Sequence, residues 1–179
     1  MFYLFLADGF EETEALAPLD MMRRAKIEVK TVGVTGEFVT GSHGVTVKAD
    51  LKPEEISFNN IDGVVLPGGM PGTVNLGKSE TVTKAAVYCA ENGKITAAIC
   101  AAPSVLGNLG ILKGKKATCF PGFEKELEGA TYTAVPVEID GNVITGKGAG
   151  CAILFGKAIV EKAVSAEAAN KVCGDMQCP

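Results

Sequence analysis

Cys100 is the residue whose position in this sequence is most typical of a chemical function. It follows Ile95–Ile99, a short apolar run with two isoleucines and a threonine that predicts a buried strand. Ala101, Ala102 and Pro103 come next, and proline is tolerated in the first turn of the helix that we expect there. A nucleophile elbow has this geometry, and the start of a helix favours a thiolate. The alternative is a structural cysteine at the end of a strand, because free cysteines are commonly buried and inert.

Three carboxylates, Glu11, Glu12 and Glu14, follow the first apolar run of the chain. Acidic side chains favour the start of a helix for dipole reasons alone, so their role can be purely structural. The functional interpretation is that one of them points toward the cysteine. A carboxyl group held beside a thiolate is pushed toward its neutral form and can donate a hydrogen bond to sulfur.

The glycines of Pro67-Gly68-Gly69 could bring backbone N–H groups close to a reacting oxygen, as an oxyanion hole requires. A tight turn would use glycine equally well. Neither this loop nor Gly146–Gly150 matches a phosphate-binding motif, so nucleotide binding is disfavoured.

His43 is the only histidine, so a Cys–His catalytic dyad would have to use it. It lies between Val39–Thr40 and Val45–Ala49, where the sequence predicts the tip of a hairpin. More often such a histidine is simply exposed. The six cysteines contain no C-x-x-C pair, and we expect neither a metal nor another cofactor.

The length of 179 residues predicts a single domain spanning 1–179, and 47% hydrophobic residues with 22 glycines suggest a compact α/β protein. The net charge of −4 and the lack of a dense basic cluster argue against sequence-specific nucleic-acid binding. The short apolar N-terminus is not typical of a signal peptide, and no run is long enough to span a bilayer. We therefore expect no membrane partner, a cytoplasmic location and reduced cysteines.

Apolar runs alternate with segments of helical periodicity along the chain, which predicts a parallel sheet covered on both faces. The predicted strands are Phe2–Leu6, Ile27–Val34, Ile61–Leu66, Ile95–Ile99, Ala117–Cys119, Val135–Asp140 and Asn142–Thr145. The first predicted helix is Glu11–Ala25, with an irregular first turn caused by Pro18. The second is capped by Ser79 and runs through Asn92. The last long helix is predicted at Gly150–Val164, and a frayed tail at Gly174–Pro179. In such sheets ligands bind beyond the carboxyl ends of the strands. The acidic turn, the Pro67–Gly72 loop and Cys100 all fall at that edge.

Three motifs in this order resemble the ThiJ/PfpI superfamily: GFEETEALAPLDMMRRA at 9–25, VVLPGG at 64–69 and AAICAAP at 97–103. The resemblance is closest to the branch of the Parkinson-disease-associated protein deglycase and its bacterial relatives. It covers nearly the whole chain, including TGKGAG at 145–150.

This resemblance implies a flavodoxin-like, class I glutamine amidotransferase-like three-layer α/β sandwich with a mostly parallel sheet, and a homodimer. It implies a reactive cysteine at Cys100 and a protonated glutamate beside it, which matches Glu14. The amides of Gly69 and Ala101 match the oxyanion-stabilising positions, with Gly68 in the same loop. The activities attributed to the family are cofactor-independent glyoxalase chemistry, removal of early glycation adducts from protein and nucleotides, chaperone action and peroxide sensing.

The sequence departs from the family at three positions. Ala101 stands where the peptidase-like branch has a histidine, which disfavours a protease. Phe120 stands where closer relatives have a histidine beside the active site. His43 replaces an arginine of a possible anion-binding site near the dimer interface, whereas Arg24 keeps the place of its partner.

The leading hypothesis is a cysteine-dependent enzyme of glyoxalase or deglycase type that acts on small aldehydes or on glycated protein or nucleotide. The alternative is a non-enzymatic redox sensor or chaperone that uses the same oxidisable cysteine. An amidase or peptidase is the least favoured hypothesis, because it needs a histidine near Cys100.

Overall fold

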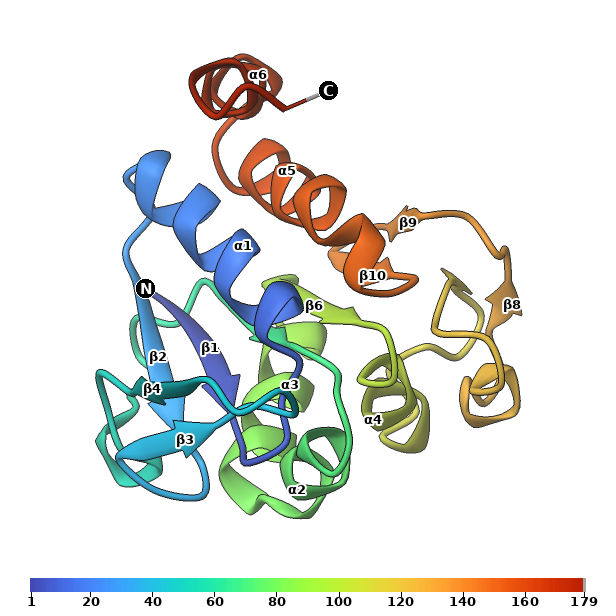
Figure 1. The fold of residues 1–179 in the computed structure, drawn as a ribbon. Helices are drawn as coiled ribbons and strands as arrows, with labels where there is room; N and C mark the ends of the chain where they lie inside the picture. The colour runs from blue at the N-terminus through green and yellow to red at the C-terminus, as the bar shows by residue number, and fades with distance from the viewer. Residues whose placement is uncertain (179) are drawn as a thin grey trace.

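The protein, described over residues 1–178 by a computed structural model, is built on a six-stranded sheet (Figure 1). The strand order is β2 (Val29–Gly33), β1 (Phe2–Leu6), β5 (Gly63–Leu66), β6 (Ile95–Ile99), β10 (Val143–Gly146) and β9 (Val137–Asp140). The first five strands are parallel, and β9 pairs antiparallel with β10. This arrangement confirms the predicted flavodoxin-like α/β sandwich with a mostly parallel sheet.

Helices cover both faces of the sheet, as Figure 1 shows. One layer contains α1 (Glu12–Arg24), α5 (Ala152–Ala163) and α6 (Ala166–Asp175). The other contains α2 (Gly72–Lys78), α3 (Glu80–Glu91) and α4 (Pro103–Asn108). Every residue of β1 and β6 is buried, because each strand packs against a helix layer on both sides.

Smaller elements complete the fold. Strands β3 (Phe38–Thr40) and β4 (Thr46–Lys48) form an antiparallel hairpin, and β7 (Lys116–Ala117) pairs with β8 (Thr131–Tyr132). Short 3₁₀ helices cover Pro53–Glu55, Glu124–Glu126 and Ala149–Cys151. The hairpin lies beside the first turn of α1, and this contact shapes one side of the candidate site (Figure 1).

The predicted strands β1 and β6 and the helix capped by Ser79 are confirmed. Two predictions are wrong. Helix α1 is continuous from Glu12 through Pro18 to Arg24, and its first turn is capped by Glu11, so the expected irregular first turn is absent. The helix predicted at Gly150–Val164 is not the last one, since α6 follows it and packs on α5 through Ala169 and Val172.

Gly174 and Asp175, the first two residues of the predicted frayed tail, lie within α6, and residues 176–178 follow the helix; Pro179 lies outside the described residues. Within residues 1–178 we find no helix that is both long and apolar enough to cross a membrane.

Candidate active site

Cys100 lies directly after β6, at the edge where β1 and β5 also end. Its backbone has a φ of +66°, a left-handed conformation that is strained for a residue with a Cβ. Two hydrogen bonds hold this turn: the Cys100 N–H donates to the Gly146 carbonyl at 2.8 Å, and the Phe120 N–H donates to the Cys100 carbonyl at 2.8 Å. The side chain is only partly buried, so small molecules can reach the sulfur. The geometry agrees with the sharp elbow that the sequence predicts.

Glu14 lies in the first turn of α1 and is completely buried, at 0% exposure. Its Oε2 accepts a hydrogen bond from the Gly68 N–H at 2.9 Å. Its Oε1 is buried and has no hydrogen-bond partner among residues 1–178. A buried carboxylate with one unpaired oxygen is costly, so this position favours the neutral acid.

The loop after β5 and the start of α1 are tied together by backbone hydrogen bonds. The Glu11 N–H donates to the Gly68 carbonyl at 3.0 Å, and Glu11 Oε2 caps the helix by accepting from the Glu14 N–H at 2.8 Å. Gly68 therefore holds Glu14 with its own N–H and is not free to bind an oxyanion. This corrects the prediction that Gly68 belongs to the oxyanion hole.

Cys100 and Glu14 influence each other strongly. Burial raises the pKa of Glu14 to about 7, aided by the charge of Glu11 and opposed by the contacts with Cys100 and the Gly68 amide. Burial also raises the pKa of the Cys100 thiol to about 12, together with the charge of Glu14 and a hydrogen bond to it. The expectation of a lowered cysteine pKa is therefore wrong, because burial raises this pKa and the charge of Glu14 adds to the effect.

The amide N–H groups of Ala101 and Gly69 act on Cys100 in the opposite direction, because they hydrogen-bond its sulfur and stabilise the thiolate. Gly69 has a φ of +88°, and a Cβ there would overlap the backbone of Glu11, so only glycine fits. These two amides were predicted as oxyanion donors from the resemblance. The structure brings both of them to the sulfur.

His43 lies at the tip of the β3–β4 hairpin, as predicted, and it pairs with Glu12 rather than with Cys100. Its Nδ1 is 2.9 Å from Glu12 Oε2, and its backbone N–H donates to Glu12 Oε1 at 2.8 Å. Burial alone would raise the pKa of Glu12, but the hydrogen bonds from His43 and Val45 outweigh it and lower that pKa to about 2. The pairing raises the pKa of His43.

Arg24 and His43, the possible anion-binding pair, do not lie together within one chain. Arg24 lies at the end of α1 and donates to Asp20 at 2.8 Å, whereas His43 contacts Glu12 at the beginning of the helix. An anion site that combines them would need a second chain.

Glu11, Glu12 and His43 are of the types that bind metals, and their ligand atoms lie within 4.8 Å of one another. The Glu12 oxygens already accept hydrogen bonds from the His43 and Val45 amides and contact the His43 ring. These contacts explain the cluster as a lock between α1 and the hairpin, and we assign no metal to it.

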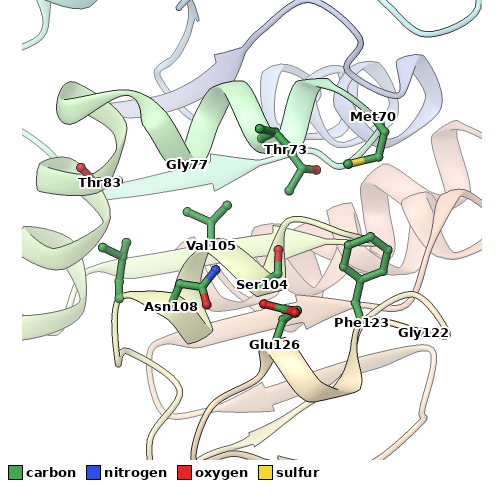
Figure 2. A pocket seen from close by; sticks show the side chains of 12 residues that line it. Met70, Thr73, Gly77, Thr83, Ser104, Val105, Asn108, Gly122, Phe123 and Glu126 are labelled. Atoms are coloured by element: carbon green, nitrogen blue, oxygen red, sulfur yellow. The ribbon is translucent and has the colours of Figure 1, made fainter.

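A cavity of about 420 Å³ opens between α2, α4 and the Glu124–Glu126 turn (Figure 2). Thr73 lies on one wall, and Ser104 and Glu126 lie on the opposite one. Cys100 and Glu14 do not line it. Two residues of the cavity wall connect it to the site around Cys100. Met70 directly follows Gly69, and the Ser104 hydroxyl on α4 donates to the Ala101 carbonyl at 2.7 Å.

Two roles were missed in the sequence. The first is the role of the Gly68 amide as the hydrogen-bond partner of Glu14, and the second is the role of Glu12 as the partner of His43. Both depend on contacts between residues more than 30 positions apart in the sequence. The acidic cluster and the lone histidine gave a signal for the second contact. No signal in the sequence distinguishes an amide that binds a carboxylate from one that binds an oxyanion.

Several known proteins are similar to this chain in sequence or in structure. The Parkinson disease protein 7 homolog of Danio rerio is 38% identical over 176 residues, covering 94% of this chain and 92% of that protein. A deglycase of Pyrococcus abyssi is 33% identical over 144 residues, covering 79% and 86%. The structure of oxidised Toxoplasma gondii DJ-1 matches with a TM-score of 0.94 and 32% identity, covering 98% and 97%.

Two DJ-1 homologs of Arabidopsis thaliana are longer, and this chain spans 36% and 44% of their lengths. The family model described as DJ-1/PfpI matches residues 2–162, which include the α1 acids, the loop after β5 and the elbow cysteine. The resemblance seen in the sequence is thus confirmed, and the chain belongs to the DJ-1/PfpI family.

Proposed function

We propose that this protein is a cysteine-dependent enzyme of glyoxalase or deglycase type, in which Glu14 accepts the proton of Cys100. The observation that supports it most is the pairing of a partly accessible thiol with a fully buried carboxyl group whose pKa is about 7. A group with a pKa near the working pH is the most effective general base. The relative named a deglycase supports the same class of reaction.

More amide groups face the sulfur than face Glu14, although burial disfavours a negative charge on either group. The sulfur has the amides of Ala101 and Gly69 and partial access to water, whereas Glu14 has the Gly68 amide and an unpaired Oε1. The intrinsic acidity of a carboxyl group and the burial of the sulfur oppose the transfer of the proton from Cys100 to Glu14. Two further influences that keep the proton on the sulfur come from the charge of Glu14 itself. They disappear once Glu14 takes the proton.

In the proposed reaction the thiolate adds to the aldehyde carbon of a substrate such as methylglyoxal and forms a hemithioacetal. The amides of Gly69 and Ala101 stabilise the oxygen that becomes negative. Glu14 gives the thiol proton to that oxygen and then, as a carboxylate, moves a proton from the first substrate carbon to the second, which leaves a thioester. Water hydrolyses the thioester, which breaks the C–S bond, releases lactate and restores the thiol. For a glycated amine, Cys100 would add to the aminocarbinol adduct and Glu14 would protonate the leaving amine.

Conversion of methylglyoxal to lactate tests this proposal. Cys100→Ser should lose activity altogether, and Glu14→Gln should lose about 10²–10⁴-fold, the usual worth of general acid–base catalysis. Glu28→Gln, which removes an exposed carboxylate, is the control and should keep full activity. A Cys100→Ser variant as fast as the parent would refute the proposal.

A second candidate is a redox sensor or chaperone that uses the same cysteine. The hydrogen bond between the Glu14 carboxyl group and the Cys100 side chain favours it, because a protonated carboxyl group there could also hydrogen-bond a sulfinate. Mass spectrometry of peroxide-treated protein distinguishes the two. Gain of two oxygens at Cys100 without measurable aldehyde turnover would favour sensing.

An amidase or peptidase lacks support from the described residues. His43 is held by Glu12, and Phe120 and Ala101 occupy the two positions where relatives have a histidine. We also propose, from the family alone, a homodimer in the cytoplasm.

A further inference from the structure

Helix α6 ends in a Schellman motif formed by two cysteines and the residues between them. Gln177 has a φ of +56° and donates its N–H to the Gly174 carbonyl at 3.1 Å. The Cys178 N–H donates to the Cys173 carbonyl at 2.9 Å. A left-handed residue flanked by these two hydrogen bonds defines the motif.

The Schellman motif brings two particular side chains into contact, those of the third-last helical residue and of the residue after the left-handed one. Both positions are usually apolar; here they are Cys173 and Cys178. The two side chains are near enough for Cys178 to raise the pKa of Cys173. Both side chains are partly exposed, so a small oxidant can reach them.

The backbone geometry suits a covalent bond between these thiols. A disulfide needs Cα atoms about 4.4–6.8 Å apart and side chains that face each other. The direct backbone hydrogen bond of 2.9 Å between the two residues favours this arrangement, as does the place of both cysteines at the contacting positions of the Schellman motif.

Lys157 on α5 provides a positive charge beside Cys173. Burial and the neighbouring Cys178 raise the pKa of Cys173, and the Lys157 ammonium opposes them. A nearby ammonium group stabilises the thiolate, which is the form that attacks an oxidant. Lys157 therefore partly offsets the effects of burial and of Cys178 on Cys173.

We propose that Cys173 and Cys178 are a redox-active pair that closes to an intramolecular disulfide on reaction with a hydroperoxide. The Cys173 sulfur attacks the O–O bond and becomes a sulfenic acid, and the peroxide leaves as an alcohol or water. The Cys178 sulfur then attacks the sulfenic sulfur; the S–S bond forms, the S–O bond breaks and water is released. The two sulfurs lose two electrons in total, and the peroxide gains them.

This reaction is independent of the chemistry proposed for Cys100. The pair lies at the end of the outermost helix, whereas Cys100 lies at the edge of the sheet (Figure 1). Closing the ring would fasten the last turn of α6, which packs on α5, and added thiol would reverse it.

Peptide mapping of the full chain tests the proposal. Trypsin cleaves after Lys171 and releases residues 172–179, a peptide that carries both cysteines. After treatment with hydrogen peroxide and blocking of free thiols with iodoacetamide, we expect this peptide to have lost two hydrogens and to carry no alkyl group. Dithiothreitol should restore two alkylatable thiols.

Three variants sharpen the result. Cys178→Ser should abolish the loss of two hydrogens, and Cys151→Ser, which removes another partly buried cysteine, should leave it unchanged. Lys157→Gln should slow the reaction several-fold at neutral pH. The folded protein should also form the bond faster than the same chain in denaturant. Two alkylated cysteines after oxidation, or equal rates in folded and denatured protein, would overturn the proposal.

Discussion

The Gly68 amide N–H donates to Glu14 Oε2 at 2.9 Å, and this bond connects the loop after β5 to the carboxyl group beside the nucleophilic cysteine. The bond holds the buried carboxyl group of Glu14 next to the sulfur. No cationic side chain is among the described contacts of Glu14, so this amide is important for its position. The position of Glu14, more than the presence of a cysteine at an elbow, gives the site its proposed chemistry.

Gly68→Ala should displace Glu14 and reduce activity. A Cβ at this position would lie 2.7 Å from Cys100 Cβ and 2.7 Å from Glu14 Oε2, so both side chains would have to move. We expect turnover of methylglyoxal to fall by about 10²-fold, since small displacements of catalytic groups cost that much, and stability to fall by about 1–3 kcal/mol from overpacking.

Gly77→Ala is the matched control for this substitution. Its Cβ would meet Val105 Cγ2 at 3.5 Å, an ordinary contact, and alanine favours the helix. Equal activity losses in the two variants would show that the Gly68–Glu14 contact has no special role.

Glu14→Gln should change how stability depends on pH. The unfolded chain releases this proton near pH 4.5, but the folded protein keeps it until about pH 7. The free energy of unfolding of the parent should therefore fall as the pH rises through this window, by about 3 kcal/mol at 1.36 kcal/mol per pKa unit.

The variant lacks the ionisable group, so this decline should disappear. Urea unfolding of both proteins at pH 5 and pH 8 measures the difference. An identical decline in the variant would mean that other groups cause it.

Glu12→Gln should loosen the contact between α1 and the β3–β4 hairpin. The carboxylate is stabilised by His43 and has a pKa of about 2, so its contribution is complete above about pH 4.5 and is lost as the pH falls toward 2. We expect a loss of about 1.5–3 kcal/mol near pH 6, the usual worth of hydrogen bonds to a charged group.

Thermal unfolding across this pH range checks the prediction, with Glu28→Gln as an exposed control. The deficit of Glu12→Gln should shrink as the medium becomes more acidic. A constant deficit would argue that the charge of Glu12 is unimportant.

Cys89 and Cys119 should resist alkylation in the native protein. Both are completely buried, so iodoacetamide cannot reach their sulfurs, whereas the other four cysteines are only partly buried. Brief treatment with iodoacetamide, followed by peptide mapping, should label Cys100, Cys151, Cys173 and Cys178 first. Early labelling of Cys89 would contradict the described packing.

Much of the fold followed from local patterns. The runs that form β1 and β6 are apolar throughout, and strands buried on both faces have that character. Helix α6 was missed although Ser165 could have indicated its N-cap, because its apolar face is mostly alanine and gives a weak periodic signal.

The site was only partly predictable. Residue types narrowed the acid to Glu11, Glu12 or Glu14, and the family resemblance selected Glu14. The proton balance between Glu14 and Cys100 could not be predicted, because it depends on burial and on which amides face which atom. The same limit explains why Gly68 was given the wrong role.

The most direct test of the central claim is the pH dependence of Cys100 alkylation in the parent and in Glu14→Gln, followed by mass spectrometry of the Cys100 peptide. If Glu14 accepts the cysteine proton, the parent rate should rise with a midpoint near pH 7, the pKa of Glu14, and the variant should require a much more alkaline medium. Superimposable profiles for the two proteins, or faster alkylation of the variant at neutral pH, would contradict the account.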